Sequence, residues 1–282
     1  MILNIVFCKY FTHLINYLQR ILLKYDIQVC VIKEIDITVL SMHLIFNLRD
    51  LIDLPQNYIV YNFEQLEISN LSDLFYINLN NAHKILDYSL NNIQFLSSRN
   101  ISAIHIPYTW FPNLKTISHP IPMHERTNSF MFIGNMNKRR VDVLRPLHKY
   151  AKKHNLQMFI SSNCWVEYYN SISSTSKISI NLHFYDNNTI LEVHRIIPNI
   201  LNKIIVITER SNDSFYDDML DNCVTWIDSV SDLEAKFNEL INMKSDDLDN
   251  LANERLYTLL NKTKIFDSNI HLITNSISYT NS

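Results

Sequence analysis

A single glycine, Gly134, occurs among the 282 residues of this chain. Turns that need a positive φ angle are usually built on glycine, because the Cβ atom of any other residue is crowded there. Asparagine and aspartate tolerate that conformation best after glycine, so we expect them at most of these turns. The same scarcity excludes a Walker loop and a complete G-x-G-x-x-G loop, since both need several glycines.

The overall composition indicates a globular protein with a sizeable core. Hydrophobic residues make up 47% of the chain and charged residues 19%. The net charge of −3 argues against a nucleic-acid partner, which usually requires a basic excess. The four cysteines are scattered and form no C-x-x-C pair, which predicts free thiols and a cytoplasmic location. No apolar stretch is long enough to predict a membrane span.

Short apolar runs alternate with amphipathic stretches along the whole chain. The predicted strands are 2–7, 28–32, 43–46, 58–61, 84–86, 103–106, 130–133, 156–160, 177–182, 203–208 and 223–227. The predicted helices are 12–24, 89–98, 137–154, 189–202, 230–243 and 246–260. This alternation predicts an α/β fold in which helices cover both faces of parallel sheets.

The alternation is interrupted once, where four of the seven prolines fall between 107 and 122. We therefore predict a Rossmann-like lobe at 1–112, a linker at 113–128, a second such lobe at 129–262 and a tail at 263–282 that packs back on the first lobe. The two lobes are expected to face each other across a cleft, with ligands at the carboxyl ends of the strands.

The segment around the glycine predicts an anion site. A strand ends at Gly134, Asn135 follows, and a helix carrying Arg139 and Arg140 in its first turn begins close by. Cations at a helix N-terminus oppose the helix dipole, and a bound anion would remove this conflict. The alternative is a solvated basic turn.

Further candidates follow the later strands of the second lobe. Asn181 and His183 end one strand, and Glu209 and Ser211 follow another. Glu192 and Arg195 lie three residues apart on a predicted helix, where the carboxylate can accept hydroxyl hydrogen bonds and the guanidinium can hold a diphosphate. The alternatives are an ordinary surface ion pair for Glu192 and Arg195 and a structural role for His183.

In the first lobe, polar residues follow two predicted strands. Asn62 and Asp87 are predicted to contact an acceptor, and Glu64 to act as a general base. A helix-capping role is the alternative for Glu64. The histidines show no metal-ligand spacing, so neither a metal nor a cofactor is predicted.

Taken in order, these segments resemble the GT-B class of glycosyltransferases, and within it the CgeB-like proteins of bacteria and large viruses. The resemblance covers about 130–226 and consists of Phe-Ile-Gly134, Lys177-Ile-Ser-Ile-Asn-Leu-His183, His194-Arg-Ile-Ile-Pro198 and Thr208-Glu-Arg-Ser211. It implies metal-independent transfer of a sugar from a UDP- or GDP-sugar donor, held by the second lobe, to a hydroxyl acceptor on a glycan or another molecule, held by the first.

The resemblance assigns roles to individual residues. Arg195 matches the arginine of the family pattern R-x-x-E-A-x-x-x-G, and Arg139 or Arg140 lies where the family has a diphosphate contact. The pattern's glutamate, which holds the donor ribose, falls on Pro198, and its glycine falls on Lys203. Glu192 or Glu209 would have to replace that glutamate. The competing hypotheses are a catalytically silent nucleotide-binding module and a sugar-nucleotide epimerase.

Overall fold

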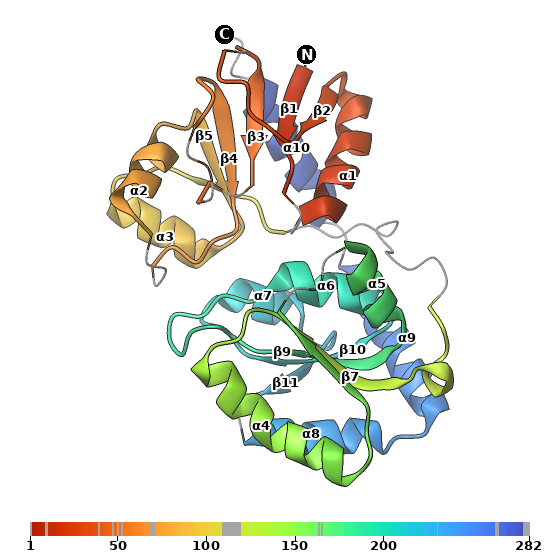
Figure 1. Ribbon diagram of the computed structural model, residues 1–282. Coiled ribbons are helices and arrows are strands. Elements are labelled where there is room, and N and C mark those ends of the chain that lie inside the picture. The colour runs from red at the N-terminus through yellow and green to blue at the C-terminus, as the bar shows by residue number, and fades with distance from the viewer. Residues whose placement is uncertain are drawn as a thin grey trace. The chain divides into compact units, whose positions relative to one another are not determined.

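A computed structural model describes residues 2–8, 11–38, 40–46, 48–49, 51, 53–67, 71–108, 120–162, 164, 166–229, 231–262 and 265–278. The chain divides into two compact units (Figure 1). The first unit contains 1–109 and 264–282, and the second contains 110–263. Each unit has a parallel β-sheet with helices packed against it, as the alternation of the sequence predicts.

The first unit has a six-stranded parallel sheet in the order β2-β1-β3-β4-β5-β6. Its strands are β1 (Ile2–Val6), β2 (Gln28–Ile32), β3 (Met42–Ile45), β4 (Tyr58–Asn62), β5 (Lys84–Asp87) and β6 (Ile104–His105). Asn62 pairs in register with Asp87, so both residues lie at the carboxyl edge of this sheet. The central strands β3 and β4 are buried along their whole length, because helices and loops cover both faces.

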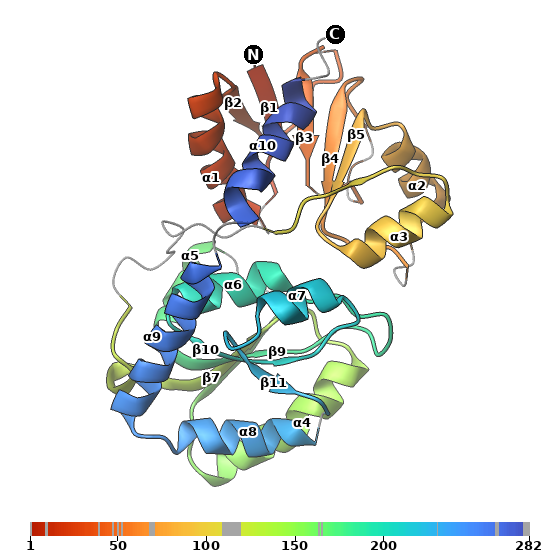
Figure 2. The same cartoon turned by 180° about the vertical axis from the view of Figure 1, so that it is seen from behind.

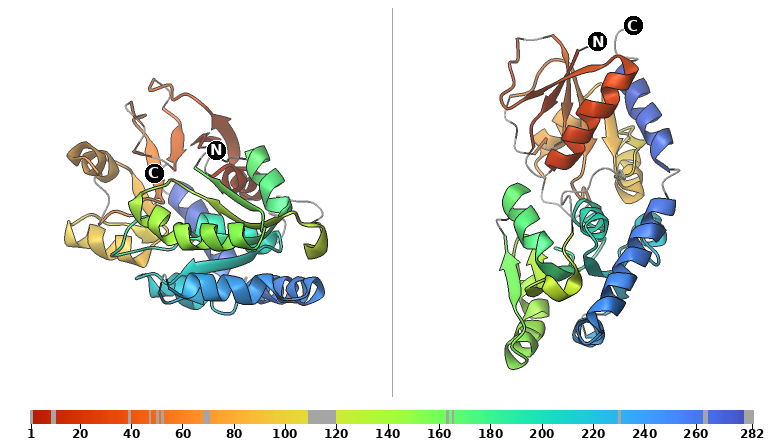
Figure 3. Two further views of the ribbon diagram at one scale, coloured as in Figure 1. Left: turned by 60° about the horizontal axis from the view of Figure 1, so that its bottom comes forward. Right: turned by 90° about the vertical axis from the view of Figure 1, so that its right-hand side faces the viewer.

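The helices of the first unit are α1 (Thr12–Leu22), α2 (Asp73–Asn80), α3 (Leu90–Ser98) and α10 (Ile265–Ser278). Helix α1 packs against β2, and the right-hand view of Figure 3 shows it alongside the sheet. The predicted tail forms α10, which belongs to this unit and lies in front of the sheet at β1 and β3 in the view of Figure 2. Asn269 of α10 donates a hydrogen bond to the carbonyl oxygen of Pro107 at 3.5 Å.

The second unit has a five-stranded parallel sheet in the order β11-β10-β9-β7-β8. Its strands are β7 (Asn128–Ile133), β8 (Met158–Ser161), β9 (Ser176–Asn181), β10 (Ile205–Glu209) and β11 (Thr225–Ile227). Its helices are α4 (Lys138–Lys153), α5 (Val166–Ser174), α6 (Val193–Leu201), α7 (Ser214–Met219), α8 (Asp232–Ile241) and α9 (Ser245–Asn261). Apolar side chains of α4, α8 and α9 join those of the sheet in one core.

The predicted linker at 113–128 needs a correction. Residues up to 119 lie outside the described part of the chain, but 120–128 pack into the second unit. Met123 is fully buried, and the Arg126 guanidinium donates to the carbonyl oxygens of Ser176 and Lys203. The prolines thus mark an irregular segment that is nevertheless anchored by burial and hydrogen bonds.

The turns use the residues that a chain with one glycine must use. Positive φ angles occur at Asp26, Asn100, Asn155, Asn188, Lys203 and Asn222 among the described residues. Five of these six are asparagine or aspartate, which confirms the prediction. Lys203, with φ of 57°, stands where the family pattern has glycine, so the left-handed backbone is present without the glycine.

Four helices, α2, α5, α7 and α10, were not predicted from the sequence, which gave α10 only as a tail. The other three are short or weakly amphipathic, so local periodicity does not reveal them. The predicted helix 189–202 begins later, at Val193, and Glu192 occupies its N-cap position. Pro198 lies inside α6 and has no N–H to donate, yet the helix continues to Leu201.

Candidate functional site

Gly134 directly follows β7 at the carboxyl edge of the second sheet, and two guanidinium groups pack against it. A Cβ atom placed on Gly134 would lie 2.9 Å from Nη1 of Arg195 and 3.2 Å from Nη1 of Arg140. Its φ angle is not positive, so the backbone conformation does not require glycine, and a Cβ atom here would instead press on the flexible end of Arg195. The groups that lie closest to this backbone are thus two arginines, and the predicted anion site stays a prediction.

Arg139 and Arg140, at the start of α4, are held by carboxylates of the protein. Arg139 donates from Nη1 to Glu209 Oε2 at 3.0 Å and from Nε to Asp186 Oδ1 at 2.6 Å. The Arg140 side chain is 1% exposed and its Nη2 lies 3.1 Å from Glu192 Oε1. The conflict between these cations and the helix dipole is therefore relieved by internal acids, and the alternative of a solvated basic turn is wrong for Arg140, which is buried.

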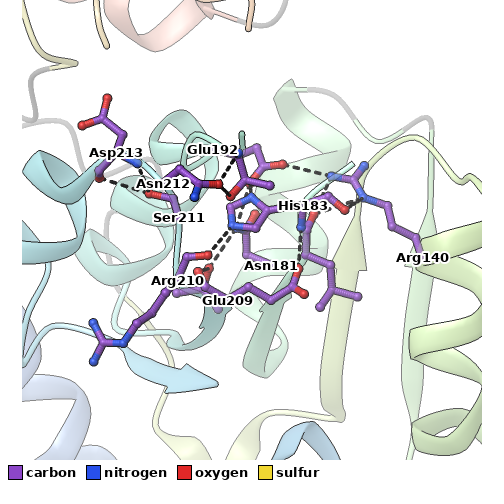
Figure 4. Close-up of polar contacts among 12 residues, drawn as sticks. Arg140, Asn181, His183, Glu192, Glu209, Arg210, Ser211, Asn212 and Asp213 are labelled. Carbon is purple, nitrogen blue, oxygen red and sulfur yellow. Dashed lines mark hydrogen bonds and ion pairs between the residues drawn. The ribbon is translucent and has the colours of Figure 1, made fainter. Parts of the chain in front are cut away.

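Glu192 lies at the centre of a buried polar cluster (Figure 4). Besides Arg140, its carboxylate accepts a hydrogen bond from Asn181 Nδ2 at 3.1 Å and lies 3.4 Å from His183 Nδ1, an ion-pair distance. The imidazole is fixed on its other side, where Nε2 lies 2.9 Å from the carbonyl oxygen of Arg210. The two strand-end residues Asn181 and His183 thus meet Glu192, and none of the three residues is more than 8% exposed.

The charges in this cluster shift one another's pKa values. Burial alone would lower the pKa of His183, but Glu192 and Glu209 outweigh it and raise the value. Burial would raise the pKa of Glu192, yet His183, Arg195 and Arg140 hold it well below its ordinary range. Glu192 is therefore an ionised carboxylate at neutral pH, and the protonated form of His183 is favoured beside it.

Arg195 differs from the other two arginines of the site. Its guanidinium is half-buried and packs beside Gly134. Among the described residues, it has no ion pair and no side-chain hydrogen bond. The alternative of a surface ion pair between Glu192 and Arg195 is thus wrong, and among the described residues of this site Arg195 is a cation that remains available to a ligand.

Two further polar residues near Arg195 were not anticipated. The Tyr169 hydroxyl of α5 donates to Asn199 Oδ1 of α6 at 2.6 Å. Burial raises the pKa of Tyr169 to about 12, while the charge of Arg195 opposes that rise. The sequence did carry one indication of α5, the helix that holds Tyr169. The chain between two parallel strands such as β8 and β9 must cross over the sheet, and a helix usually forms that connection.

The segment after β10 is held in place by its own hydrogen bonds. The Ser211 hydroxyl donates to Asp217 Oδ1 at 2.9 Å, and the backbone N–H of Asn212 donates to the carbonyl oxygen of Thr189 at 2.9 Å. The backbone N–H of Thr189 returns a bond to Asn212 Oδ1 at 2.8 Å. Ser211 and Glu209, both predicted to contact the donor, are engaged here within the protein, which makes the edge of the sheet rigid.

In the first unit, two of the predicted acceptor contacts are buried. Asp87 is 0% exposed and accepts from Asn62 Nδ2 at 2.7 Å, from Asn92 Nδ2 at 3.0 Å and from the backbone N–H of Ser89 at 2.9 Å. Asn62 is also buried. Their burial argues against direct contact with an acceptor and assigns both residues to fixing the ends of β4 and β5.

Glu64 remains accessible. Its side chain is 35% exposed and Oε2 lies 3.9 Å from Arg49 Nη1. The next described helix, α2, is capped by Ser72, which accepts from the backbone N–H of Phe75. Glu64 therefore does not cap that helix, and the predicted role as a general base stays a prediction.

Aromatic rings gather around Phe63 at the same edge of the first sheet. Its ring centroid lies 4.4 Å from that of Phe11, 4.5 Å from that of Tyr61 and 5.3 Å from that of Tyr88. Phe46 and Tyr108 complete this aromatic cluster. The cluster was not predicted, because its members come from separate strand ends.

Neither a metal-binding cluster nor a membrane span is found in the described part of the chain. No three His, Cys, Asp or Glu residues there gather in a way that could hold a metal ion. No described helix combines the length and the apolar character needed to cross a membrane.

Several solved structures with a similar fold are glycosyltransferases. The chain is similar to Anabaena HepE in complex with UDP-glucose, with a TM-score of 0.60 and 10% identity over 98% of this chain and 99% of that one. It is also similar to WaaG, a glycosyltransferase involved in lipopolysaccharide biosynthesis, with a TM-score of 0.55 and 10% identity over 92% and 95% of the two chains. The fold is of the GT-B type.

Two further similar proteins are longer than this chain, and the similarity covers only part of each. TarM matches with a TM-score of 0.53 and 13% identity over 84% of this chain and 54% of its own. An uncharacterized protein of Acanthamoeba polyphaga mimivirus is 29% identical over 177 residues, which are 61% of this chain. That alignment spans about half, 54%, of the viral protein. The chain matches no protein-family model.

Proposed function

We propose that this protein is a glycosyltransferase that takes a nucleotide-sugar donor and holds the donor's diphosphate at Arg195 and Gly134. The observation that carries the proposal is the guanidinium of Arg195, which packs beside the bare backbone of Gly134 with no partner among the described side chains. An arginine in such a place can form charge-assisted hydrogen bonds to phosphate oxygens. HepE, which has the same fold, binds UDP-glucose, and this makes UDP the first nucleotide to test.

In the proposed reaction an acceptor hydroxyl attacks the anomeric carbon of the donor sugar. The new glycosidic bond forms as the bond to the diphosphate breaks, and Arg195 stabilises the negative charge on the leaving group. We expect no metal to be required, because the guanidinium and the N-terminus of α4 supply positive charge. If configuration is inverted, Glu64 is the base that takes the hydroxyl proton.

The main rival is a protein of this fold that binds nucleotides without transferring sugar. Its support is Pro198, which stands where the family pattern has the ribose-binding glutamate. Glu192 and Glu209, the two predicted replacements, already pair with Arg140 and Arg139. Donor binding without any sugar transfer or donor hydrolysis would favour the rival.

The test compares UDP and UDP-glucose binding between the native protein and Arg195→Ala. Loss of a charged hydrogen bond to the diphosphate is expected to weaken binding by roughly 10- to 100-fold. Calorimetric titration measures the affinity, and circular dichroism checks the fold. Arg145→Ala is the matched control, since Arg145 is exposed on α4 and pairs with Asp142 at 3.1 Å. Equal affinities in the native protein and Arg195→Ala would overturn the proposed diphosphate site.

A further inference from the structure

Glu192 and Arg195 have opposite charges and a spacing of three residues, which ordinarily favours an ion pair. The carboxylate lies close enough to the guanidinium for Arg195 to depress the pKa of Glu192. The two side chains nevertheless form no ion pair, since the Glu192 oxygens lie against other donors. Arg195 therefore remains available to a ligand although it lies beside the ionised carboxylate of Glu192.

Three side chains from other elements hold the Glu192 carboxylate. Arg140 of α4 binds Oε1, while Asn181 and His183 at the end of β9 contact Oε2. The last two are themselves anchored, because Asn181 Nδ2 also donates to Thr208 Oγ1 at 3.0 Å and His183 Nε2 contacts the carbonyl oxygen of Arg210. The carboxylate is thus fixed by groups that belong to the rigid sheet edge.

We propose that Asn181 and His183 are positioning residues, which divert Glu192 from Arg195 and so keep the Arg195 guanidinium open to the anionic part of the ligand. The proposal rests on the proposed function, because it assumes that Arg195 binds the donor diphosphate. Neither residue touches the ligand in this scheme. Each acts by holding an acid that would otherwise compete with the phosphate for the same cation.

A purely structural role for the cluster leads to a different expectation. If Asn181 and His183 only hold the edge of the sheet, their loss lowers the free energy of unfolding but leaves the affinity of the folded protein for nucleotide unchanged. If they divert Glu192, their loss lowers the affinity, and neutralising Glu192 restores it. Affinity in the double variant therefore separates the two roles, as in a double-mutant cycle.

The experiment titrates UDP into the purified full chain by calorimetry at pH 7. In His183→Leu, which removes the imidazole that pairs with the Glu192 carboxylate, the affinity is expected to fall about tenfold, the size of one competing charged interaction. In His183→Leu combined with Glu192→Gln, most of that loss is expected to be recovered. His183→Gln retains an N–H donor and should bind more tightly than His183→Leu. His124→Leu, at an exposed position of the same unit, is the matched control.

The outcomes separate this proposal from the proposed function. If UDP does not bind the native protein, or binds Arg195→Ala equally well, the diphosphate site and this proposal both fail. If Arg195→Ala loses affinity but His183→Leu does not, or if the double variant remains as weak as His183→Leu, this proposal alone is overturned. Should His183→Leu not fold, Asn181→Leu with and without Glu192→Gln provides the same comparison through the other holder of Oε2.

Discussion

At the carboxyl edge of the second sheet, buried carboxylates pair with most of the cations: Glu209 with Arg139, and Glu192 with Arg140 and His183. Arg195 has no such partner among the described residues. The carboxyl edge of the first sheet instead ends in the aromatic cluster around Phe63 and in the hydrogen-bonded pair Asn62 and Asp87. The ion pair between Arg49 and Glu64 in the first unit is exposed to solvent. The two units share a topology, but among the described residues it is the second unit that concentrates positive charge where a phosphate could be bound.

This difference has an energetic side. Buried charges lose their hydration, so removing one member of a buried cluster leaves its partner unpaired and lowers the free energy of unfolding strongly. When one member of an exposed pair is removed, water solvates the other, and the free energy of unfolding changes little. The second unit is thus expected to respond strongly to charge removal and to pH, and the first only weakly. Three changes test this contrast.

The largest effect is expected for Glu192→Ala. Removing this carboxylate leaves the Arg140 guanidinium, 1% exposed, without its acidic partner, and such a loss typically costs about 3–5 kcal/mol of unfolding free energy. Urea unfolding followed by circular dichroism measures it. In the control Glu239→Ala, which breaks the exposed pair with Lys236, the change should stay below about 1 kcal/mol. Similar small losses in both variants would contradict the picture of a buried, mutually dependent cluster.

A second, intermediate effect concerns pH. Burial lowers the pKa of His194 to about 3, whereas Glu192 and Glu209 raise that of His183 above 6.5 despite burial. Protonated His183 contributes to the free energy of unfolding; this contribution is complete below pH 6.5 and is lost as the pH rises through the folded pKa of His183. Neutral His194 also contributes to the free energy of unfolding; its contribution is complete above pH 6.5 and is lost as the pH falls towards 3.

We therefore expect the free energy of unfolding to decline on both sides of a maximum close to pH 6.5, the unshifted histidine value. Urea midpoints measured between about pH 5 and pH 9 test this expectation. In His183→Gln the decline on the alkaline side should flatten while the acid side is kept. An unchanged alkaline slope in that variant would show that His183 is not the group responsible.

The smallest effect on stability is expected for Glu64→Gln in the first unit. Its carboxylate is 35% exposed and 3.9 Å from Arg49, so the free energy of unfolding should change by less than about 1 kcal/mol. If Glu64 is the general base, the rate of sugar transfer should nevertheless fall by roughly 10²- to 10⁴-fold. Product formation from UDP-glucose, compared with that of Glu67→Gln at a neighbouring exposed position, separates a catalytic role from a surface role.

Much of the fold could be predicted from local sequence. Apolar runs such as 130–133 and 203–208 are short and rich in large or β-branched residues, so they indicate buried strands wherever they occur. The short helices α2, α5 and α7 were missed because they are stabilised by the sheets they cover and not by their own periodicity. The segment 120–128 was taken for linker because proline content does not reveal that Met123 is buried.

The order and spacing of residues by themselves determined that this chain forms two parallel α/β units, that its turns rely on asparagine and aspartate, and that Gly134, Asn181 and Glu209 lie near strand ends. These features depend on neighbouring residues along the chain. Which acid neutralises which arginine was decided by the tertiary structure, since Arg140 meets Glu192 across 52 residues and Arg139 meets Glu209 across 70. Local spacing favoured Glu192 with Arg195, but the buried donors of α4 and β9 bind that carboxylate instead and leave Arg195 free among the described residues.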